Sequence, residues 1–151
     1  LMVVLIGFGY AKPVPTTPAN YKSFWATLFV AAAGPAMNLI LAIITINVYQ
    51  IGIQADWGLF GGQAAYNFFT FLALINLLLM LFNLIPIGPL DGHYILPYFL
   101  PRKLAQHYYY YNHRYGSYAL LGLVVLNLMG VPIFRHVWNL GQSLLPIITL
   151  V

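Results

Sequence analysis

The sequence contains no cysteine, and charged residues make up only 5% of it. The lack of cysteine excludes disulfide bonds and thiolate metal sites, so a transition metal would need histidine, carboxylate or water as ligands. Soluble domains are about 25% charged. This chain is 62% hydrophobic with a mean hydropathy of +0.82, so it belongs in a lipid bilayer. No basic run with interleaved aromatic residues is present, so we expect no nucleic-acid partner.

Long apolar segments predict an all-α, polytopic helical membrane protein with three to four spanning segments. No internal repeat or linker divides the chain, so residues 1–151 are expected to form a single membrane-embedded domain. Three prolines in residues 7–20 predict a short extended segment near the N-terminus. The expected spans are residues 25–51, 64–84 and 117–130, and residues 134–151 are expected to re-enter or cross the membrane again.

Residues 83–92, with the sequence NLIPIGPLDG, follow an apolar run of membrane length and contain one of the chain's two acids, Asp91. Their prolines remove backbone donors and their glycines permit tight turns, so the helix must end near Asn83. Irregular backbone at membrane depth is stable only when it is buried in protein or faces water. A carboxylate at mid-bilayer costs roughly 2.5–3.5 kcal/mol and usually pairs, lines a wet cavity or binds a cation. The segment indicates an active-site or ion-site loop, and a solvated helix cap is the alternative.

Small residues form one face of the first expected span. Ala31, Gly34, Asn38 and Ala42 recur at helical spacing, which predicts close helix packing of the small-xxx-small kind. Tight packing of this kind also fixes the position of a polar group such as Asn38 on the same face.

Three motifs together resemble one family. The pattern Asn-x-x-Pro-x-x-Pro-Leu-Asp-Gly in residues 83–92 resembles the signature of the site-2 protease family of intramembrane zinc metalloproteases. Residues 9–15, GYAKPVP, look like a segment of compact prokaryotic members, and residues 33–38, AGPAMN, look like the family's Ala-Gly-Pro-x-x-Asn element. The motifs occur in the family's order and cover the chain from about residue 7 to residue 93.

The resemblance implies roles for four residues. Asp91 would be the third zinc ligand, and Asn83 would act with it in catalysis by holding the substrate strand. Asn38 and Pro86 are implied as further substrate-positioning residues. The implied cofactor is Zn²⁺, and the implied partner is a transmembrane protein substrate that is cleaved within the bilayer, as in regulated intramembrane proteolysis.

The family's remaining ligands are missing from the sequence. In the family, the first two zinc ligands and the general base lie in a His-Glu-x-x-His helix, and this chain contains no glutamate. Residues 1–6 are apolar, do not begin with methionine and are too few to span a membrane. We therefore expect an N-terminally truncated fragment, the C-terminal part of an intramembrane metalloprotease core, which would be inactive alone.

Other functions remain open on the sequence alone. The missing glutamate also favours a non-catalytic membrane scaffold or a degenerate protease homologue that binds membrane partners. An ion channel built around Asp91 is disfavoured, because one acid with few polar neighbours makes a poor permeation path. Metal dependence would separate a protease from a scaffold. A homo-oligomer is an open alternative to a monomer.

Basic residues predict the orientation in the membrane. They flank the first two expected spans on one side, whereas residues 52–62 contain none, and the positive-inside rule assigns the basic side to the cytoplasm. We expect an integral protein of a prokaryotic plasma membrane with the Asp91 end facing the cytoplasm and Arg135 as an exception on the opposite side. The basic residues expected on the cytoplasmic side are Lys12, Lys22, Arg102, Lys103 and Arg114.

Residues 102–115 combine basic, histidine and tyrosine side chains, which predicts an interfacial helix or hairpin at the level of the lipid headgroups. His107 and His113 lack the four-residue spacing that puts two ligands on one helix face, so we interpret them as solvated or interfacial. His93 is a nearer candidate ligand because it lies two residues from Asp91, but the resemblance gives it no such role.

Overall fold

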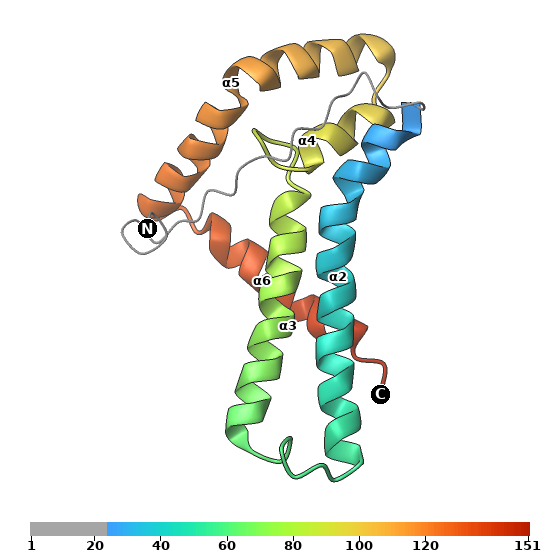
Figure 1. Ribbon diagram of the computed structural model, residues 1–151. Helices are drawn as coiled ribbons and strands as arrows, with labels where there is room; N and C mark the ends of the chain where they lie inside the picture. The colour runs from blue at the N-terminus through green and yellow to red at the C-terminus, as the bar shows by residue number, and fades with distance from the viewer. Residues whose placement is uncertain (1–23) are drawn as a thin grey trace, which may run out of the picture.

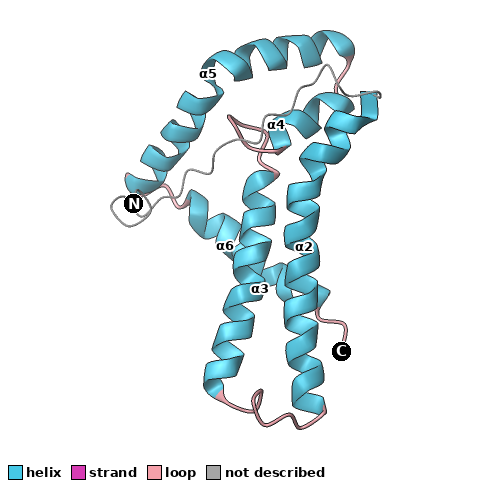
Figure 2. Ribbon diagram, in the orientation of Figure 1, coloured by secondary structure: helices cyan, strands magenta, loops and turns pink. Residues whose placement is uncertain are grey.

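The computed structural model describes residues 24–151 (Figure 1). The extended segment expected in residues 7–20, the motif in residues 9–15 and the basic residues Lys12 and Lys22 lie outside the described residues. Helices account for the regular structure from residue 24 onwards, and no strand occurs in that part of the chain (Figure 2). The predicted all-α membrane architecture is therefore confirmed.

Two long apolar helices form an antiparallel hairpin. Helix α2 (Phe24–Gln54) contains Pro35 in its interior, and helix α3 (Gln63–Asn83) returns alongside it (Figure 1). The spanning parts, Trp25–Gln54 and Gln63–Asn83, have mean hydropathies of 2.1 and 1.9 and are long enough to cross a membrane. The two expected spans at residues 25–51 and 64–84 are confirmed with nearly the predicted bounds.

The core of the molecule lies between these two helices and receives one residue from the C-terminal end. Its buried residues are Ala42, Ile46, Tyr49, Ala73, Leu77, Met80 and Ile148. On the small-residue face of α2, Ala31 and Ala42 are buried, Asn38 is half-buried and Gly34 is exposed, so close packing is confirmed at two of the four positions. Asn76 is buried but donates to the carbonyl of Leu72 in its own helix, at 2.8 Å, rather than to another helix.

Residues after α3 form a cap at one end of the hairpin. An irregular segment leads into α4 (Gly92–Ile95), the 3₁₀ turn η2 (Leu96–Phe99) and the long helix α5 (Arg102–Leu128). Helix α5 is continuous, so the expectation of a separate spanning segment beginning at Ser117 is wrong. The run of polar and aromatic residues that predicted an interfacial element is helical and continues directly into the apolar half.

Helix α6 (Ile133–Ile148) follows α5 after a bend of 91°. The bend occurs where Gly130 adopts a φ of +100°, and Pro132 precedes the new helix. Together α5 and α6 are apolar enough to count as one broken span or a re-entrant pair. The described residues therefore contain two to three candidate spans, which meets the lower end of the predicted three to four.

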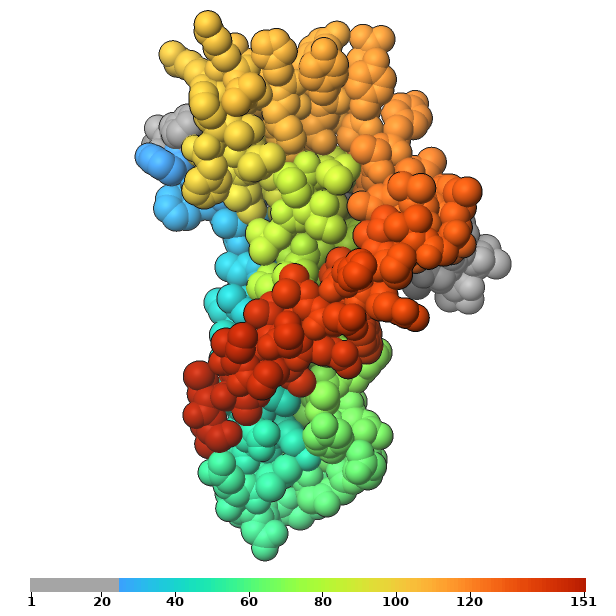
Figure 3. Space-filling view, turned by 180° about the vertical axis from the view of Figure 1, so that it is seen from behind, coloured from blue at the N-terminus to red at the C-terminus, as the bar shows by residue number. Residues whose placement is uncertain are grey.

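Helix α6 lies diagonally across the hairpin (Figure 3). The ring of Phe134 lies 6.1 Å from that of Phe82, one residue before the end of α3, and Gly141 packs against Leu78 in the middle of α3. Arg135 consequently lies near the Asp91 end of the hairpin and not on the opposite side as expected. The expectation was wrong because it assumed that α5 crosses the membrane, whereas the bend returns the chain to α3.

The C-terminal end of α6 is tied to α2 by one amide. Asn47 donates to the carbonyl of Ile148 at 2.8 Å and accepts from the backbone N–H of Leu150 at 2.7 Å. These carbonyl and amide groups lie at the end of a helix, where no intrahelical partner exists. Asn47 therefore fixes the end of α6 against the first spanning helix.

Candidate metal-ligand site

The irregular segment after α3 has the backbone that its prolines and glycines predict. Helix α3 ends at Asn83, and Gly88 adopts a φ of +63°, a conformation that favours glycine. The turns are closed by short backbone bonds, such as the one from the N–H of Ile87 to the carbonyl of Ile85 at 2.9 Å. We call residues 84–91 the Asp91 loop.

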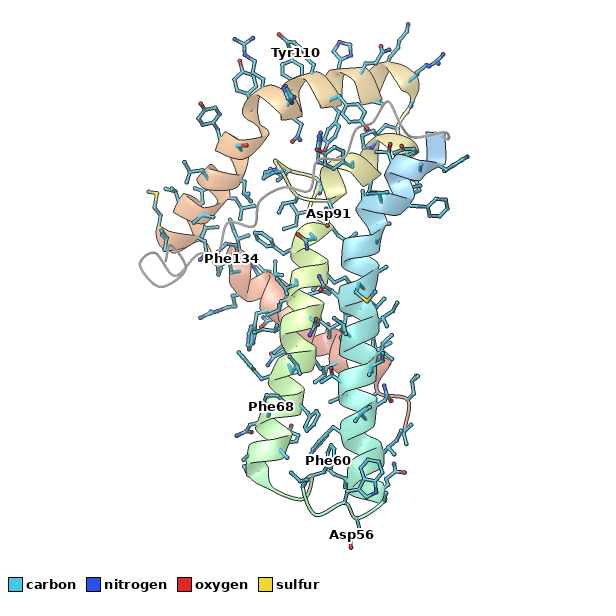
Figure 4. The ribbon with its side chains drawn as sticks, viewed as in Figure 1. Asp56, Phe60, Phe68, Asp91, Tyr110 and Phe134 are labelled. Atoms are coloured by element: carbon cyan, nitrogen blue, oxygen red, sulfur yellow. The ribbon has the colours of Figure 1, made fainter. Side chains whose placement is uncertain are left out.

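Asp91 lies where the loop meets the first spanning helix. A Cβ atom added to Gly34 would lie only 2.7 Å from the Oδ2 atom of Asp91, so the carboxylate lies directly against the helix backbone. Figure 4 shows Asp91 beside α2 and just beyond the end of α3, far from the end of the hairpin that carries Asp56. The Ala-Gly-Pro element of residues 33–35 and the Leu-Asp-Gly element of residues 90–92 are therefore in contact.

Gly92 permits a second close approach. A Cβ atom on Gly92 would overlap the carbonyl group of Leu84 and lie 2.7 Å from the carbonyl oxygen of Ile85. The start of α4 is thus packed against the start of the Asp91 loop, backbone against backbone. This contact explains why glycine follows the acid, because any side chain there would push the two ends of the loop apart.

The environment of Asp91 favours binding of a cation. Asp91 follows the end of α3, outside both spanning helices, and burial raises the pKa of its carboxyl above the ordinary aspartate value. No basic side chain in residues 24–151 offsets this effect, and the carboxylate forms no hydrogen bond with any described residue. Its oxygen lone pairs are therefore free to bind a positive group.

The described residues fit zinc only in part. A carboxylate oxygen is a known zinc ligand, so the chemistry of Asp91 suits the metal. No group of three potential ligands occurs in residues 24–151, however. His107 and His113 are exposed, as expected for solvated or interfacial histidines, and His136 is exposed as well. Asp91 can therefore supply one ligand, and the described part of the chain does not complete the set.

His93 is buried, with 8% of its surface exposed, and its ring is engaged elsewhere. The side-chain amide of Asn112 donates to the Nδ1 atom of His93 at 2.6 Å. The same amide bonds both backbone groups of Gly88, which fixes its donor end toward His93. Nδ1 is thus an acceptor, and burial, together with the nearby His113, lowers the pKa of His93. The neutral His93 serves the structure and is not placed as a second ligand.

Helix α5 contributes contacts to this site that the sequence pattern did not predict. The hydroxyl of Tyr108 donates a hydrogen bond to the carbonyl of Pro86 at 2.8 Å. The side-chain oxygen of Asn112 accepts a hydrogen bond from the N–H of Gly88 at 3.0 Å. Gly116 approaches Gly88 so closely that an added Cβ would lie 2.8 Å from the Gly88 Cα. Tyr108, Asn112 and Gly116 recur every four residues and so share one helix face. That spacing was the available signal.

The remaining predicted site residues surround the loop without closing it. Asn83 is the last residue of α3, and Asn38 lies one turn after Gly34 in α2. The two asparagines are half-buried. Neither side chain forms a hydrogen bond with another residue in the described range. Pro86 is exposed and contributes its carbonyl to Tyr108. The predicted residues thus lie on the elements that meet at Asp91, while their proposed roles stay predictions.

A separate groove of about 420 Å³ lies between α3 and α6. It is lined by Ile75, Leu78, Leu79, Phe82, Phe134, Val137 and Trp138. Its lining contains no titratable or metal-binding group, so it cannot perform chemistry, and the Asp91 loop remains the candidate functional site.

Comparison with known proteins identifies a family and two relatives of this chain. The sequence pattern of Peptidase family M50 matches residues 48–126, which include α3, the Asp91 loop and most of α5. The chain is 33% identical over 108 residues to "Putative zinc metalloprotease YwhC" of Bacillus subtilis (strain 168), covering 67% of this chain and 48% of the relative. It is 44% identical over 73 residues to "Putative zinc metalloprotease sll0528" of Synechocystis sp. (strain ATCC 27184 / PCC 6803 / Kazusa), covering 48% and 17% respectively. No solved structure matches significantly.

Proposed function

The chain belongs to Peptidase family M50, the site-2 protease family, and from this premise we propose that it forms the C-terminal part of an intramembrane zinc metalloprotease core in which Asp91 is the third zinc ligand. The chain spans about half the length of YwhC and less than a fifth of sll0528. The other two ligands and the general base belong, in this proposal, to a His-Glu-x-x-His helix outside the 151 residues. The substrate is a transmembrane protein.

One observation carries the proposal: a partly buried carboxylate without a cationic partner among the described residues lies at the contact between two motifs of the chain. Gly34 leaves room for the Asp91 oxygen, and Gly92 holds the two ends of the loop together. A carboxylate whose pKa is raised by burial gains more from a bound cation than a solvated one does, because the cation replaces lost solvation. The geometry therefore supports a ligand more than a solvated helix cap.

The residues around Asp91 have separate tasks in this proposal. Zinc with three protein ligands and an open position supplies a water of pKa about 7 as nucleophile. Asp91 would contribute a fixed negative oxygen from one side of the site. Asn83, at the end of α3, would hydrogen-bond the unwound substrate strand, and Asn38 and Pro86 would border its path. The glycine contacts at Gly34 and Gly92 would keep the Asp91 loop close against the first spanning helix.

The test compares the two acids of the chain in the complete protein. We expect Asp91→Ala to reduce bound zinc from one atom per molecule toward zero and to abolish cleavage of a membrane substrate. The loss should exceed the about 10–100-fold effect of removing a residue that only supports a ligand. Asp56→Ala is the matched control, because Asp56 is exposed at the opposite end of the hairpin and should leave both quantities unchanged. Zinc is measured by elemental analysis of the purified protein.

A non-catalytic scaffold is the competing function, and the lack of a three-ligand group in residues 24–151 favours it. A scaffold predicts that the complete protein contains no stoichiometric zinc and that Asp91→Ala still binds its membrane partners. Normal zinc content and normal cleavage in Asp91→Ala would instead show that another residue is the third ligand. Each result removes one of the two functions.

We also propose an orientation for this integral membrane protein. Helix α5 carries Arg102, Lys103 and Arg114 at the Asp91 end of the hairpin, whereas residues 55–62 at the other end contain no lysine or arginine. The positive-inside rule then supports a cytoplasmic location for the Asp91 end in a prokaryotic plasma membrane.

A further inference from the structure

We propose that Asn112 is a positioning residue for the candidate zinc ligand, acting with Tyr108 and Gly116 as a helix face that holds the Asp91 loop in place. We call these three residues the α5 latch. The inference rests on the proposed function of Asp91 and extends it to a helix that the family motifs do not include.

The amide of Asn112 holds the loop at two points. Its oxygen accepts the N–H of Gly88 at 3.0 Å, and its nitrogen donates to the carbonyl of Gly88 at 3.2 Å. The nitrogen also donates to Nδ1 of His93 at 2.6 Å. One side chain therefore satisfies both backbone groups of a loop residue and binds a residue on the far side of Asp91. Backbone groups in an irregular segment need such partners when they are removed from water.

The other two latch residues extend the contact along α5. Tyr108 donates to the carbonyl of Pro86, which lies before Gly88 in the loop. Gly116, on the next turn after Asn112, allows the backbone of Gly88 to approach α5 directly. Gly88 is itself restricted to glycine by its φ of +63°. The latch thus contacts the loop at Pro86 through a hydroxyl and at Gly88 through an amide and the backbone of Gly116.

These contacts hold the backbone segment that carries the carboxylate. Asp91 lies between Gly88 and His93, both of which bind Asn112. The Asp91 side chain forms no hydrogen bond of its own in the described part of the chain. The direction of its Cα–Cβ bond is set by the backbone, which is held by the contacts of Gly34 and Gly92 on one side and by the latch on the other. Metal ligands require such support, because weak positioning lowers metal affinity.

The first experiment measures metal binding by variants of the complete protein. We expect Asn112→Ala to weaken zinc affinity by about 10–100-fold in competition with a chelator. Gln106→Ala is the control, since Gln106 is an exposed amide on the same helix. In the cobalt-substituted protein, Asn112→Ala should alter the visible d–d absorption bands, which report ligand geometry. A general loss of folding would reduce the amount of monodisperse protein without changing the spectrum of the folded fraction.

A second pair of variants removes single hydroxyls. Tyr108→Phe should weaken zinc affinity less than Asn112→Ala, because one neutral bond to Pro86 is lost. Tyr111→Phe, a change of the same chemistry at an exposed position, should have no effect. Equal behaviour of the two phenylalanine variants, combined with wild-type affinity in Asn112→Ala, would overturn the latch.

A metal-free measurement separates the latch from the proposed function. Ile87 lies between the residues bound by Tyr108 and Asn112, and a cysteine there can be labelled specifically once any cysteine outside the 151 residues is replaced, because these residues contain no other. We expect maleimide to react with Ile87→Cys in the metal-free protein several-fold faster when Asn112→Ala is added, and no faster with Gln106→Ala. An unchanged rate would overturn the latch even if Asp91→Ala loses zinc. A faster rate while Asp91→Ala keeps zinc would overturn the proposed ligand and leave only the loop contact.

Discussion

At the scale of single residues, the surroundings of Asp91 are made by glycines that allow backbone to replace side chains. Gly34 leaves space for the Asp91 carboxylate, and Gly92 leaves space for the carbonyl group of Leu84. Neither contact involves a positive φ, so the need for glycine comes from space and not from backbone conformation. Substitution at these positions therefore changes where Asp91 lies while leaving its chemistry intact.

Gly34→Ala tests this view. The new methyl group would lie 2.7 Å from the Asp91 Oδ2 atom, so the carboxylate must move, and we expect zinc content and cleavage by the complete protein to fall by about tenfold or more. Gly122→Ala is the control, because Gly122 is also helical and an added Cβ meets nothing within 4 Å. That control should be neutral or slightly stabilising, since alanine favours helix by up to about 1 kcal/mol over glycine. Wild-type zinc content in Gly34→Ala would show that the carboxylate is not confined there.

The sequence was sufficient to predict the acid, the helix end and the glycine after the acid, because each has a local cause. Closely spaced prolines and glycines end a helix, and a lone carboxylate in an apolar chain usually pairs or binds a cation. Asn112 could not be predicted in the same way. It lies 24 residues from Gly88, and its amide follows four consecutive tyrosines that favour a lipid-interface interpretation. Contacts across such a separation have no signature in the local pattern.

At the scale of elements, α5 has two functions on opposite faces. One face contacts the Asp91 loop through Asn112 and Gly116, while the other carries exposed side chains such as Tyr110 and Arg114. The exposed face agrees with the predicted interfacial helix, and Tyr110 points away from the hairpin in Figure 4. The composition of α5 therefore predicted its exposed face correctly but did not indicate the face that contacts the Asp91 loop.

Gly116→Ala addresses the inner face. The added Cβ would lie 2.6 Å from the Asn112 oxygen and 2.8 Å from the Gly88 Cα, so α5 must move away from the loop. We expect a destabilisation of about 1–3 kcal/mol, as for other overpacked sites, against little change for Gly122→Ala on the same helix. Unfolding in mixed detergent micelles measures both variants. Equal free energies of unfolding would contradict close contact between Gly116 and Gly88.

Asn47 offers a corresponding test for α6. Replacing it with leucine removes the bonds to Ile148 and Leu150, and each such bond in a membrane protein contributes about 0.6 kcal/mol on average. We expect Asn47→Leu to lower the free energy of unfolding by about 1 kcal/mol and to expose the C-terminal end to protease. Asn67→Leu, whose bond is to Gln63 within α3, should not expose that end. Protease resistance of Asn47→Leu would show that α6 is held by its apolar face alone.

At the scale of the whole molecule, the hairpin separates two chemically different ends. The Asp91 loop and the basic half of α5 lie at one end, and residues 55–62 lie at the other (Figure 1). The length and hydropathy of α2 and α3 allowed this arrangement to be predicted. The path of α5 and α6 could not be predicted, because moderate hydropathy does not distinguish a crossing helix from one bent by 91° at Gly130.

Opposite ends imply opposite sides of the membrane. We expect Gln106→Cys to react with a membrane-impermeant maleimide only from the cytoplasmic side, and Gly58→Cys only from the outside. Both positions are exposed, and an added Cβ at Gly58 meets no atom within 4 Å. Labelling of intact cells and of inverted vesicles measures the two directions. Reaction of both cysteines from one side would contradict the two-span hairpin, and reversed labelling would contradict the orientation.

The position of the α5 contacts also sets an order of events during synthesis. The hairpin of α2 and α3 and the Asp91 loop leave the ribosome first, but Asn112 and Gly116 follow only after the loop is complete. Chains fold from the N-terminal end as they are made, at about 5–20 residues per second. The loop therefore exists for a second or more in an inserted chain without its later contacts. Asp91 acquires its final position only when the helix that follows has been made and docked.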